Sequence, residues 1–239
     1  MSDGSSNVRK GGRSLQAIRV AITANDCRRF TLTAMLARPP HAMTGSPTSR
    51  IEAADVAAGL KLARAKDHAA VRALARASEV GSWQSLLALS VGTLAWGTIT
   101  HDRRLAEAGR HMLRAGLLAS LVKTSLKRTV HRTRPNVLMD EGIYARGRPG
   151  TNVGPWQSFP SGHSALSAAV ACATARAYPE IKGPAYAAAA GVTTAQVVRG
   201  AHFPADVLMG ALIGIAAEAA VHKLTHRRRR LGMRKSSVA

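Results

Sequence analysis

The polarity of the chain changes sharply near residue 82. The stretch 82–100, SWQSLLALSVGTLAWGTIT, contains no charged residue, and a helix of this length crosses most of a bilayer core at about 1.5 Å per residue. A second candidate helix at 105–126 contains scattered charges, and three candidates rich in Ala and Gly follow at 163–178, 184–200 and 205–222. Small residues let helices approach one another closely. Because no alternation of β-branched residues indicates a sheet, the pattern predicts an all-α fold: a helical bundle of about five core helices, embedded in a membrane.

A further helix precedes this bundle. Residues 51–80 are rich in Ala, Leu and charged residues and contain no Pro, a composition that favours a helix. Apolar positions that include Val56, Leu60 and Val71 fall roughly on one stripe, so the sequence predicts an additional N-terminal amphipathic helix. Two interpretations stay open: the helix lies on a membrane surface, or it covers the helical core.

Composition and charge narrow the class of partner. The 239 residues include 34 Lys and Arg against 13 Asp and Glu, a formal net charge of +21. A hydrophobic fraction of 46% excludes wholesale disorder, and the positive charge favours anionic partners. We divide the chain into a basic, disordered N-terminal arm at 1–50, a helical domain at 51–222 and a basic tail at 223–239. Cys27 and Cys172 lie far apart without metal-ligand spacing, so they indicate neither a disulfide framework nor a zinc site. Because the chain also shows no carboxylate cluster for a metal, we expect neither a metal nor a cofactor.

The loop between the second and third core helices, 127–162, is dense in Pro, Gly and polar residues. A loop of this length inside a compact domain is usually functional. Three clusters stand at helix ends in and after it: Lys127 with Arg134-Pro135, then Pro160 to His163, then Arg199 to Asp206. Singly, each is explained equally well as a cap, a turn or a surface group. Their occurrence together, in order and at fixed internal spacings, points to one site.

The residue types in these clusters suit the transfer of a phosphoryl group. Such a group needs positive donors where charge spreads in the transition state, and Lys127 and Arg134 supply an ammonium and a planar guanidinium. Their seven-residue spacing brings both to nearly one face if the helix continues. Ser161 and Gly162 directly precede an Ala-rich helix, whose free backbone N–H groups favour an anion.

Two histidines remain for covalent chemistry. His202 is the better candidate for the nucleophile, because Asp206, four residues on, is positioned to accept a hydrogen bond from the other ring nitrogen. His163 is then the general acid for the leaving oxygen. We interpret the other histidines, including His111 and His131, as surface residues.

At these motifs the sequence resembles the type 2 phosphatidic acid phosphatase (PAP2) and vanadium haloperoxidase superfamily, which also includes bacterial acid phosphatases. The family pattern Lys, six residues, Arg-Pro fits Lys127 and Arg134-Pro135; Pro-Ser-Gly-His fits 160–163; and His, three residues, Asp fits His202 and Asp206. The resemblance implies a metal-independent phosphatase that forms a phosphohistidine at His202, with orientation by Asp206 and protonation of the leaving group by His163.

One family residue is missing. The third family element begins with Ser-Arg, and Ala195-Gln196 stand there instead; in the family that arginine binds the phosphoryl group. Arg199 follows about one helical turn later, so its long side chain is able to reach the same oxygens. We hypothesise that Arg199 takes this role and that Gln196 donates a weaker, neutral hydrogen bond. Because of Gln196, a family member whose catalysis has decayed stays an alternative.

Topology suggests the substrate class. If the helices span a membrane, the three clusters meet on one side, and the opposite side receives the run Arg227 to Arg230. Since positive charge marks the cytoplasmic face, we expect an integral protein of the plasma membrane with its site on the outer face. The expected substrate is a lipid monophosphate or diphosphate, such as phosphatidate, a polyprenyl diphosphate or a phosphorylated glycolipid.

Two alternatives remain. A soluble acid phosphatase would act on small phosphate esters with the same residues. A non-catalytic basic nucleic-acid-binding protein would explain the charge, but we expect no nucleic-acid partner, because the sequence lacks interleaved aromatics for base stacking and a recognised DNA-binding motif.

Overall fold

The computed structural model describes residues 49–150 and 153–236, with side chains as far as residue 227. All of these residues belong to the second of the chain's two compact units, Met43–Ala239. The predicted N-terminal arm therefore lies almost entirely outside the described residues, as do the last residues of the predicted tail.

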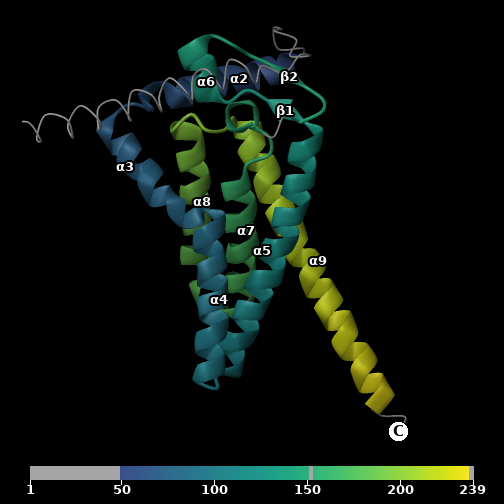
Figure 1. Cartoon of the computed structure of the whole chain (residues 1–239). Helices are drawn as coiled ribbons and strands as arrows, with labels where there is room; N and C mark the ends of the chain where they lie inside the picture. Colours follow the sequence, from purple (N-terminus) through teal and green to yellow (C-terminus); the bar gives the residue numbers. More distant parts are fainter. Residues whose placement is uncertain (1–48, 151–152, 237–239) are drawn as a thin grey trace, which may run out of the picture. The chain divides into compact units, whose positions relative to one another are not determined.

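Five long helices form the body of this unit, and Figure 1 shows them running side by side with α7 in the middle. Their bounds agree with the predicted segments to within a few residues, except that the last helix continues much farther. They are α4 (Trp83–Ile99), α5 (Arg103–Thr129), α7 (Gly162–Ala177), α8 (Lys182–Val198) and α9 (Pro204–Ser236). The predicted all-α bundle of about five core helices is confirmed.

The central position of α7 follows from its small side chains. Its Ala-rich sequence packs against α5, α8 and α9, and one core cluster joins Ala115 and Ala119 of α5, Ala169 of α7 and Ala217 of α9. At Gly210 of α9 an added Cβ would collide with the backbone carbonyl of Ser161. Glycine at this position therefore lets the start of α9 lie directly against the start of α7.

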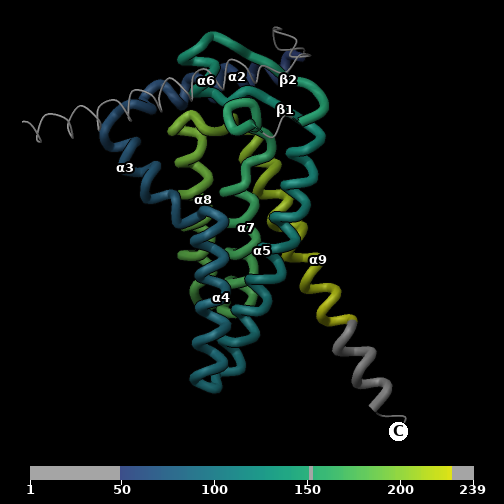
Figure 2. The backbone as a smooth tube through the Cα atoms, in the orientation of Figure 1, coloured from purple at the N-terminus to yellow at the C-terminus, as the bar shows by residue number. Residues whose placement is uncertain are grey.

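The single amphipathic helix predicted for 51–80 is instead two helices. The chain forms α2 (Arg50–Leu62), the short η1 (Ala63–Ala65), α3 (Ala69–Ala77) and η2 (Ser78–Gly81). The break is stabilised locally, because the His68 ring accepts a hydrogen bond from the Ala70 N–H and so caps α3. Figure 2 shows α2 crossing the upper ends of the bundle helices, while α3 descends toward α4.

The buried face of α2 decides between the two interpretations of this segment. Glu52, Val56 and Gly59 are buried, and an added Cβ at Gly59 would contact the ring of Phe203. The helix therefore covers the helical core, as one of the two interpretations proposed.

The long loop 127–162 has more structure than the sequence indicated. It contains α6 (Pro135–Glu141), the short η3 (Gly154–Trp156) and the two-residue strands β1 (His131–Arg132) and β2 (Arg146–Gly147), which pair antiparallel. The expectation of no sheet is wrong for this small pair. The expectation that Lys127 and Arg134 share a helix face is also wrong, because α5 ends at Thr129 and Arg134 is the N-cap of α6.

Two histidines assigned to the surface lie inside the fold. His131 is buried, and its Nδ1 lies 2.8 Å from the Pro149 carbonyl oxygen. His111 is half-buried, with Nε2 at 2.8 Å from a carboxylate oxygen of Glu218. The surface assignment of both residues is therefore wrong, because His131 is buried and one ring nitrogen of each lies against a partner distant in the sequence.

Among the described residues, one helical segment, Pro204–Arg227 of α9, is long and apolar enough to cross a membrane. The uncharged helix α4 has 17 residues, which is at the short end of what a span needs. Length and composition alone thus give only weak support for the predicted membrane embedding.

Candidate active site

The three sequence clusters meet at one end of the bundle, as Figures 1 and 2 allow the reader to follow: at the end of α5, the start of α7 and the turn from α8 to α9. The Ser161 N–H donates to the Asp206 carbonyl oxygen at 3.0 Å, which joins the second cluster to the third. Lys127 Nζ donates to the Gln157 carbonyl oxygen at 3.4 Å, which holds the first cluster to the loop before the second.

His202 is held in one orientation and one tautomer. Its ring is buried, and Nδ1 lies 2.6 Å from the backbone carbonyl oxygen of Ser158. A carbonyl oxygen only accepts, so Nδ1 has the hydrogen and Nε2 keeps a free lone pair. Burial lowers the pKa of His202 well below its ordinary value, and the positive charges of Arg134 and Lys127 lower it further. The ring is therefore neutral and able to act as a nucleophile through Nε2.

Asp206 does not play the direct part expected for it. Its carboxylate, fully buried, accepts from the Phe203 N–H at 2.9 Å, from the Ser158 hydroxyl and from Arg132 Nη1 at 2.9 Å. Within the described part of the chain it forms no hydrogen bond with His202. The expected contact is replaced by an indirect one: Asp206 fixes Ser158, and the carbonyl of Ser158 orients the ring of His202.

Arg132 was not identified from the sequence, and it holds this region together. Its guanidinium donates to Asp206 at 2.9 Å and to Asp55 of α2 at 2.7 Å, and it lies 4.2 Å from the centre of the Phe203 ring. Asp55 also accepts from the Ala205 N–H at 2.8 Å. These contacts join α2, β1 and the start of α9 in one buried network around Asp206.

A second pair of contacts from α2 reinforces this network. The hydroxyl of Tyr144 donates to Glu52, and Arg146 donates to the other carboxylate oxygen of Glu52 at 2.7 Å. Burial and the hydrogen bond to Glu52 raise the pKa of Tyr144 to about 12, so the hydroxyl stays a donor at ordinary pH.

Two of the phosphate-binding candidates, Lys127 and Arg134, differ from Arg132 because no described carboxylate pairs with them. Neither Lys127 nor Arg134 forms an ion pair with another described residue, and Arg134 Nε is buried without a partner there. Burial and the nearby charge of Arg199 lower the pKa of Arg134, as expected for a buried cation that lies near another cation. Such a cluster favours an anion between its members.

The start of α7 adds backbone donors to this cluster. Ser161 caps the helix by accepting from the Ser164 N–H, and the first N–H groups of a helix have no partner within it. A Cβ built on Gly162 would lie 3.6 Å from Nζ of Lys123. Lys123, one turn before Lys127 on α5, therefore reaches the same helix start; the one-turn spacing of the two lysines was the sequence signal for it.

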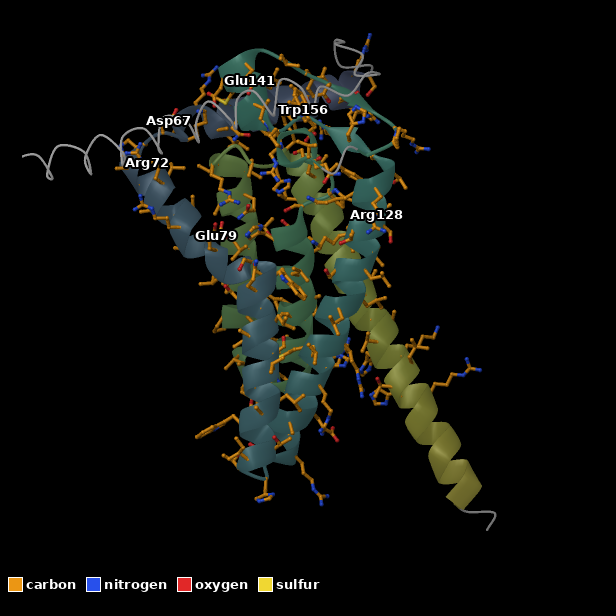
Figure 3. All side chains as sticks on the ribbon, in the orientation of Figure 1. Asp67, Arg72, Glu79, Arg128, Glu141 and Trp156 are labelled. Atoms are coloured by element: carbon orange, nitrogen blue, oxygen red, sulfur yellow. The ribbon has the colours of Figure 1, made fainter. Side chains whose placement is uncertain are left out.

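Glu79, another residue that the sequence did not single out, lies where α3 leads into α4, and Figure 3 labels it. One carboxylate oxygen accepts from Arg199 Nη1 at 2.7 Å, and the other lies 3.4 Å from His163 Nε2. Burial raises the pKa of Glu79, but the hydrogen bond from Arg199 and the charge of His163 outweigh it, so the pKa is lowered overall. An ionised carboxylate thus bridges the candidate acid and the candidate replacement arginine.

Gln196 lies deeper than expected for a phosphate ligand. Its side chain is fully buried and its amide donates to the Ser78 hydroxyl at 3.2 Å. Its backbone carbonyl accepts from the N–H groups of Ala201 and His202, at 3.0 and 3.2 Å. The residue therefore stabilises the turn that presents His202.

This arrangement defines a class of site: a buried neutral histidine beside unpaired cations and a helix N-terminus, on an all-α bundle. Such an arrangement favours the binding of an anion. The sequence profile of the PAP2 superfamily matches residues 109–230, just over half of the chain. The chain belongs to the PAP2 superfamily.

Two curated relatives are similar to part of the chain. They are the lipid A 1-phosphatases of Rhizobium johnstonii and Rhizobium etli, each 36% identical over 100 residues, or 42% of this chain. The matched segment corresponds to 39% and 41% of those proteins. The chain thus spans about two fifths of the length of the curated relatives it matches.

Two solved structures have the same fold. LpxE from Aquifex aeolicus matches 69% of this chain and 92% of its own, with a TM-score of 0.54 and 24% identity. The first transmembrane PAP2-type phosphatidylglycerolphosphate phosphatase from Bacillus subtilis matches 83% of this chain and 94% of its own, with a TM-score of 0.56 and 23% identity. At these identities the likeness establishes the fold.

Proposed function

We propose that the protein is a lipid phosphatase, which hydrolyses a phosphate monoester or diphosphate on a membrane lipid through a phosphohistidine at His202. The observation that carries this proposal is the neutral His202 with Nε2 free, beside Lys127 and Arg134, which lack carboxylate partners. The names of the two curated relatives support a phosphate on a glycolipid headgroup as the substrate.

The proposed reaction has two steps. In the first, Nε2 of His202 attacks phosphorus, the bond from phosphorus to the lipid oxygen breaks, and His163 gives its proton to that oxygen. In the second, water attacks the phosphohistidine while His163 takes one of its protons, which releases phosphate and restores both rings. Lys127, Arg134 and the N–H groups at Ser161 and Gly162 stabilise the equatorial oxygens in both steps. No step in this scheme uses a metal ion.

Arg199 takes the role of the missing family arginine in this scheme. Its charge acts on Arg134 and its guanidinium contacts Glu79, so it lies at the edge of the same cluster. Gln196 keeps one amide hydrogen beyond the one it gives to Ser78, and we retain it as a weaker, neutral donor.

We also propose that the bundle spans a membrane, with the site at one interface. Large apolar side chains are exposed on the outer faces of several helices, which a lipid environment would cover: Trp83, Val91 and Trp96 of α4, Leu117 and Leu121 of α5, and Leu208, Leu212 and Ile215 of α9. Arg103, Arg104 and Lys182 lie at the end opposite the site, which favours a cytoplasmic position for that end and an outer-face active site in the plasma membrane.

The test is phosphate release by the purified full chain from a panel of lipid phosphates, with a chelator present. We expect release that His202→Ala reduces by at least about 10⁴-fold, as for the loss of other covalent nucleophiles. The control is His101→Asn, in the turn between α4 and α5, because Asn tolerates the positive φ of that residue. Equal release by His202→Ala and the parent protein would overturn the enzyme proposal.

A second measurement separates the lipid enzyme from the soluble acid phosphatase. The membrane proposal expects the chain to stay in the membrane fraction after an alkaline wash and to prefer lipid phosphates to small phosphate esters. Recovery in the supernatant, with turnover of small esters only, would favour the soluble alternative.

A further inference from the structure

A second polar region lies at the opposite end of the bundle, where the proposed reaction uses no residue. A pocket of about 540 Å³ opens between α5, α7 and α9. Its lining includes four arginines and three histidines, among them Arg110, His111, Arg114, Arg176, His222 and His226. His111 precedes Lys127 by sixteen residues of α5, so the pocket lies about 24 Å from the phosphoryl site along that helix.

A buried carboxylate organises one wall of this pocket. Glu218 is 2% exposed; it accepts from Arg176 Nε at 2.6 Å and Nη2 at 3.0 Å, and its Oε1 lies 2.8 Å from His111 Nε2. This bidentate pair fixes the direction of the Arg176 guanidinium. The pocket therefore has a preorganised cation held by a carboxylate that faces away from solvent.

Among the other arginines of the pocket, Arg104 pairs with Glu180 at 2.9 Å, but two lack such a partner among the described residues. Arg110 and Arg114 lie one turn apart on α5, and within the described side chains neither forms an ion pair. Opposite them, the rings of His222 and His226 are in edge contact, with centroids 4.3 Å apart. Around the pocket, four arginines stand against three glutamates, namely Glu107, Glu218 and Glu180, the partner of Arg104. The net charge is therefore positive, and Arg110 and Arg114 supply the free N–H donors.

A metal ion is a weaker explanation for this cluster than an anion. The ligand atoms of His111, Glu218 and His222 lie within 4.8 Å of one another, which is close enough for a metal. However, each oxygen of Glu218 already accepts a hydrogen bond from Arg176, and Oε1 also lies within hydrogen-bond distance of His111 Nε2. A divalent cation would have to displace these donors and enter among four arginines, against their charge.

We propose that this pocket binds the phosphate group of an anionic phospholipid, in the leaflet opposite the active site. The inference rests on the membrane embedding in the proposed function. Basic pockets between membrane helices bind anionic headgroups in this way, and arginines near helix ends extend toward the interface. Exposed apolar side chains continue from the pocket toward the bilayer centre, since Leu117 lies one turn after Arg114 and Ile215 lies two turns before His222 on α9. They would contact the acyl chains.

The experiment measures lipid retention by the full chain in nanodiscs of phosphatidylcholine with a minor fraction of phosphatidylglycerol, followed by native mass spectrometry. The test variant is Arg110→Gln with Arg114→Gln. The matched control, Arg103→Gln with Lys182→Gln, removes the same charge from exposed positions outside the pocket. We expect the test variant to retain phosphatidylglycerol about tenfold less, from the loss of charge-assisted hydrogen bonds, and the control to match the parent protein.

A second arm distinguishes the sources of the phosphate. Inorganic phosphate is titrated against the detergent-solubilised parent protein and the test variant, with the melting temperature as readout. A rise in the parent protein that the test variant lacks supports a pocket that also accepts free phosphate; lipid retention without such a rise supports the headgroup alone. Equal lipid retention by test variant and control overturns the proposal, as does zinc binding by the parent protein that His222→Ala abolishes.

The outcome is independent of catalysis, because retention is measured without substrate. A chain that shows no His202-dependent phosphate release but retains phosphatidylglycerol through Arg110 and Arg114 would contradict the proposed enzyme and support the pocket. The reverse result would contradict the pocket alone.

Discussion

Arg132 and Arg134 are two residues apart in the chain, yet they belong to two regions with opposite electrostatic design. Around Arg132, two carboxylates, the half-buried Asp55 and the buried Asp206, accept its N–H groups at 2.7 and 2.9 Å. Around Arg134, the neighbours that act on its charge include the cation Arg199, and its Nε has no partner among the described residues. The first region is neutralised internally, and the second keeps its positive charge.

The difference shows how the fold separates stability from binding. A buried ion pair that loses one partner leaves an uncompensated charge, which is strongly destabilising. Cations held close without counter-ions destabilise the empty site and favour an incoming anion. We infer that the network around Arg132 stabilises the fold, which allows the mutually repelling cations around Arg134 to stay close together.

The largest expected effects come from exchanging each arginine for glutamine. Arg134→Gln should lower phosphate release about 100- to 1,000-fold, as for the loss of a donor that stabilises transition-state charge, with little change in melting temperature. Arg132→Gln should lower the free energy of unfolding by about 3–5 kcal/mol, because Asp206 and Asp55 lose their partner. Activity assays and thermal unfolding of both variants test the pair. An Arg132→Gln protein as stable as the parent would contradict the division between the two regions.

The next prediction concerns the replacement of the missing family arginine. Arg199→Ala should reduce turnover about 10- to 100-fold, since hydrogen bonds to charged groups contribute that much. Gln196→Ala should reduce it less than about tenfold, through the neutral hydrogen bonds that the amide makes. Steady-state kinetics on one lipid phosphate would compare them. If Arg199→Ala leaves turnover intact while Gln196→Ala abolishes it, the assignment of Arg199 is wrong.

The pH dependence of activity should reflect the neutral state of His202. Because burial and the charges of Arg134 and Lys127 lower its pKa, the acid limb of kcat/KM that belongs to this ring should lie below its ordinary value of 6.5. The residual activity of Arg134→Gln should have its acid limb at higher pH, since one source of the shift is removed. Arg103→Gln is the control, and comparison between variants cancels the ionisation of the substrate.

The lowered pKa of His202 also makes the stability of the folded state depend on pH. Below about pH 6.5 the unfolded chain takes up a proton at His202 that the folded site excludes, so the folded state loses stability as the pH falls. An acid limb that does not move in Arg134→Gln would contradict the electrostatic coupling between these two residues.

The smallest effect is expected at Glu79. Its carboxylate occupies donors of Arg199 and lies beside His163, so a substrate phosphate must compete with it. Glu79→Gln should lower KM about two- to fivefold, in keeping with the strength of an exposed ion pair. Glu180→Gln is a matched control, because Glu180 pairs with Arg104 at 2.9 Å with a similar exposure at the other end of the bundle. A raised KM in Glu79→Gln would show that Glu79 orients Arg199 instead of competing for it.

Apolar runs predicted the helices well because helices that pack through small residues, or expose apolar side chains as α4 does, contain few charged residues. The uncharged run became α4, and the Ala-rich segments became α7, α8 and the first part of α9. The break between α2 and α3 was missed, since it depends on a local cap at His68 and on where α2 packs. The motif spacings likewise identified the segments that meet, but a spacing along the chain does not show which side chains are in contact.

The missed residues have one property in common: each acts through a contact between distant parts of the chain. Arg132 meets Asp206 across 74 residues, and Glu79 meets Arg199 across 120. The orientation of His202 was assigned to Asp206 because a side chain four residues on was the visible partner. The actual partner is the Ser158 backbone carbonyl. Because every residue has a backbone carbonyl, the sequence contains no signal that singles this one out.

The contacts made by α2 show that the candidate catalytic unit is larger than the segment that the family profile matches. The segment that the family profile matches begins at residue 109, while Glu52, Asp55 and Glu79 lie upstream of it. A fragment cut at the profile boundary would keep every motif residue and yet lose Asp55, one of the two counter-ions of Arg132, and Glu79, the partner of Arg199. Moving this active site onto another scaffold would therefore require α2 and the segment that contains Glu79 as well as the motifs.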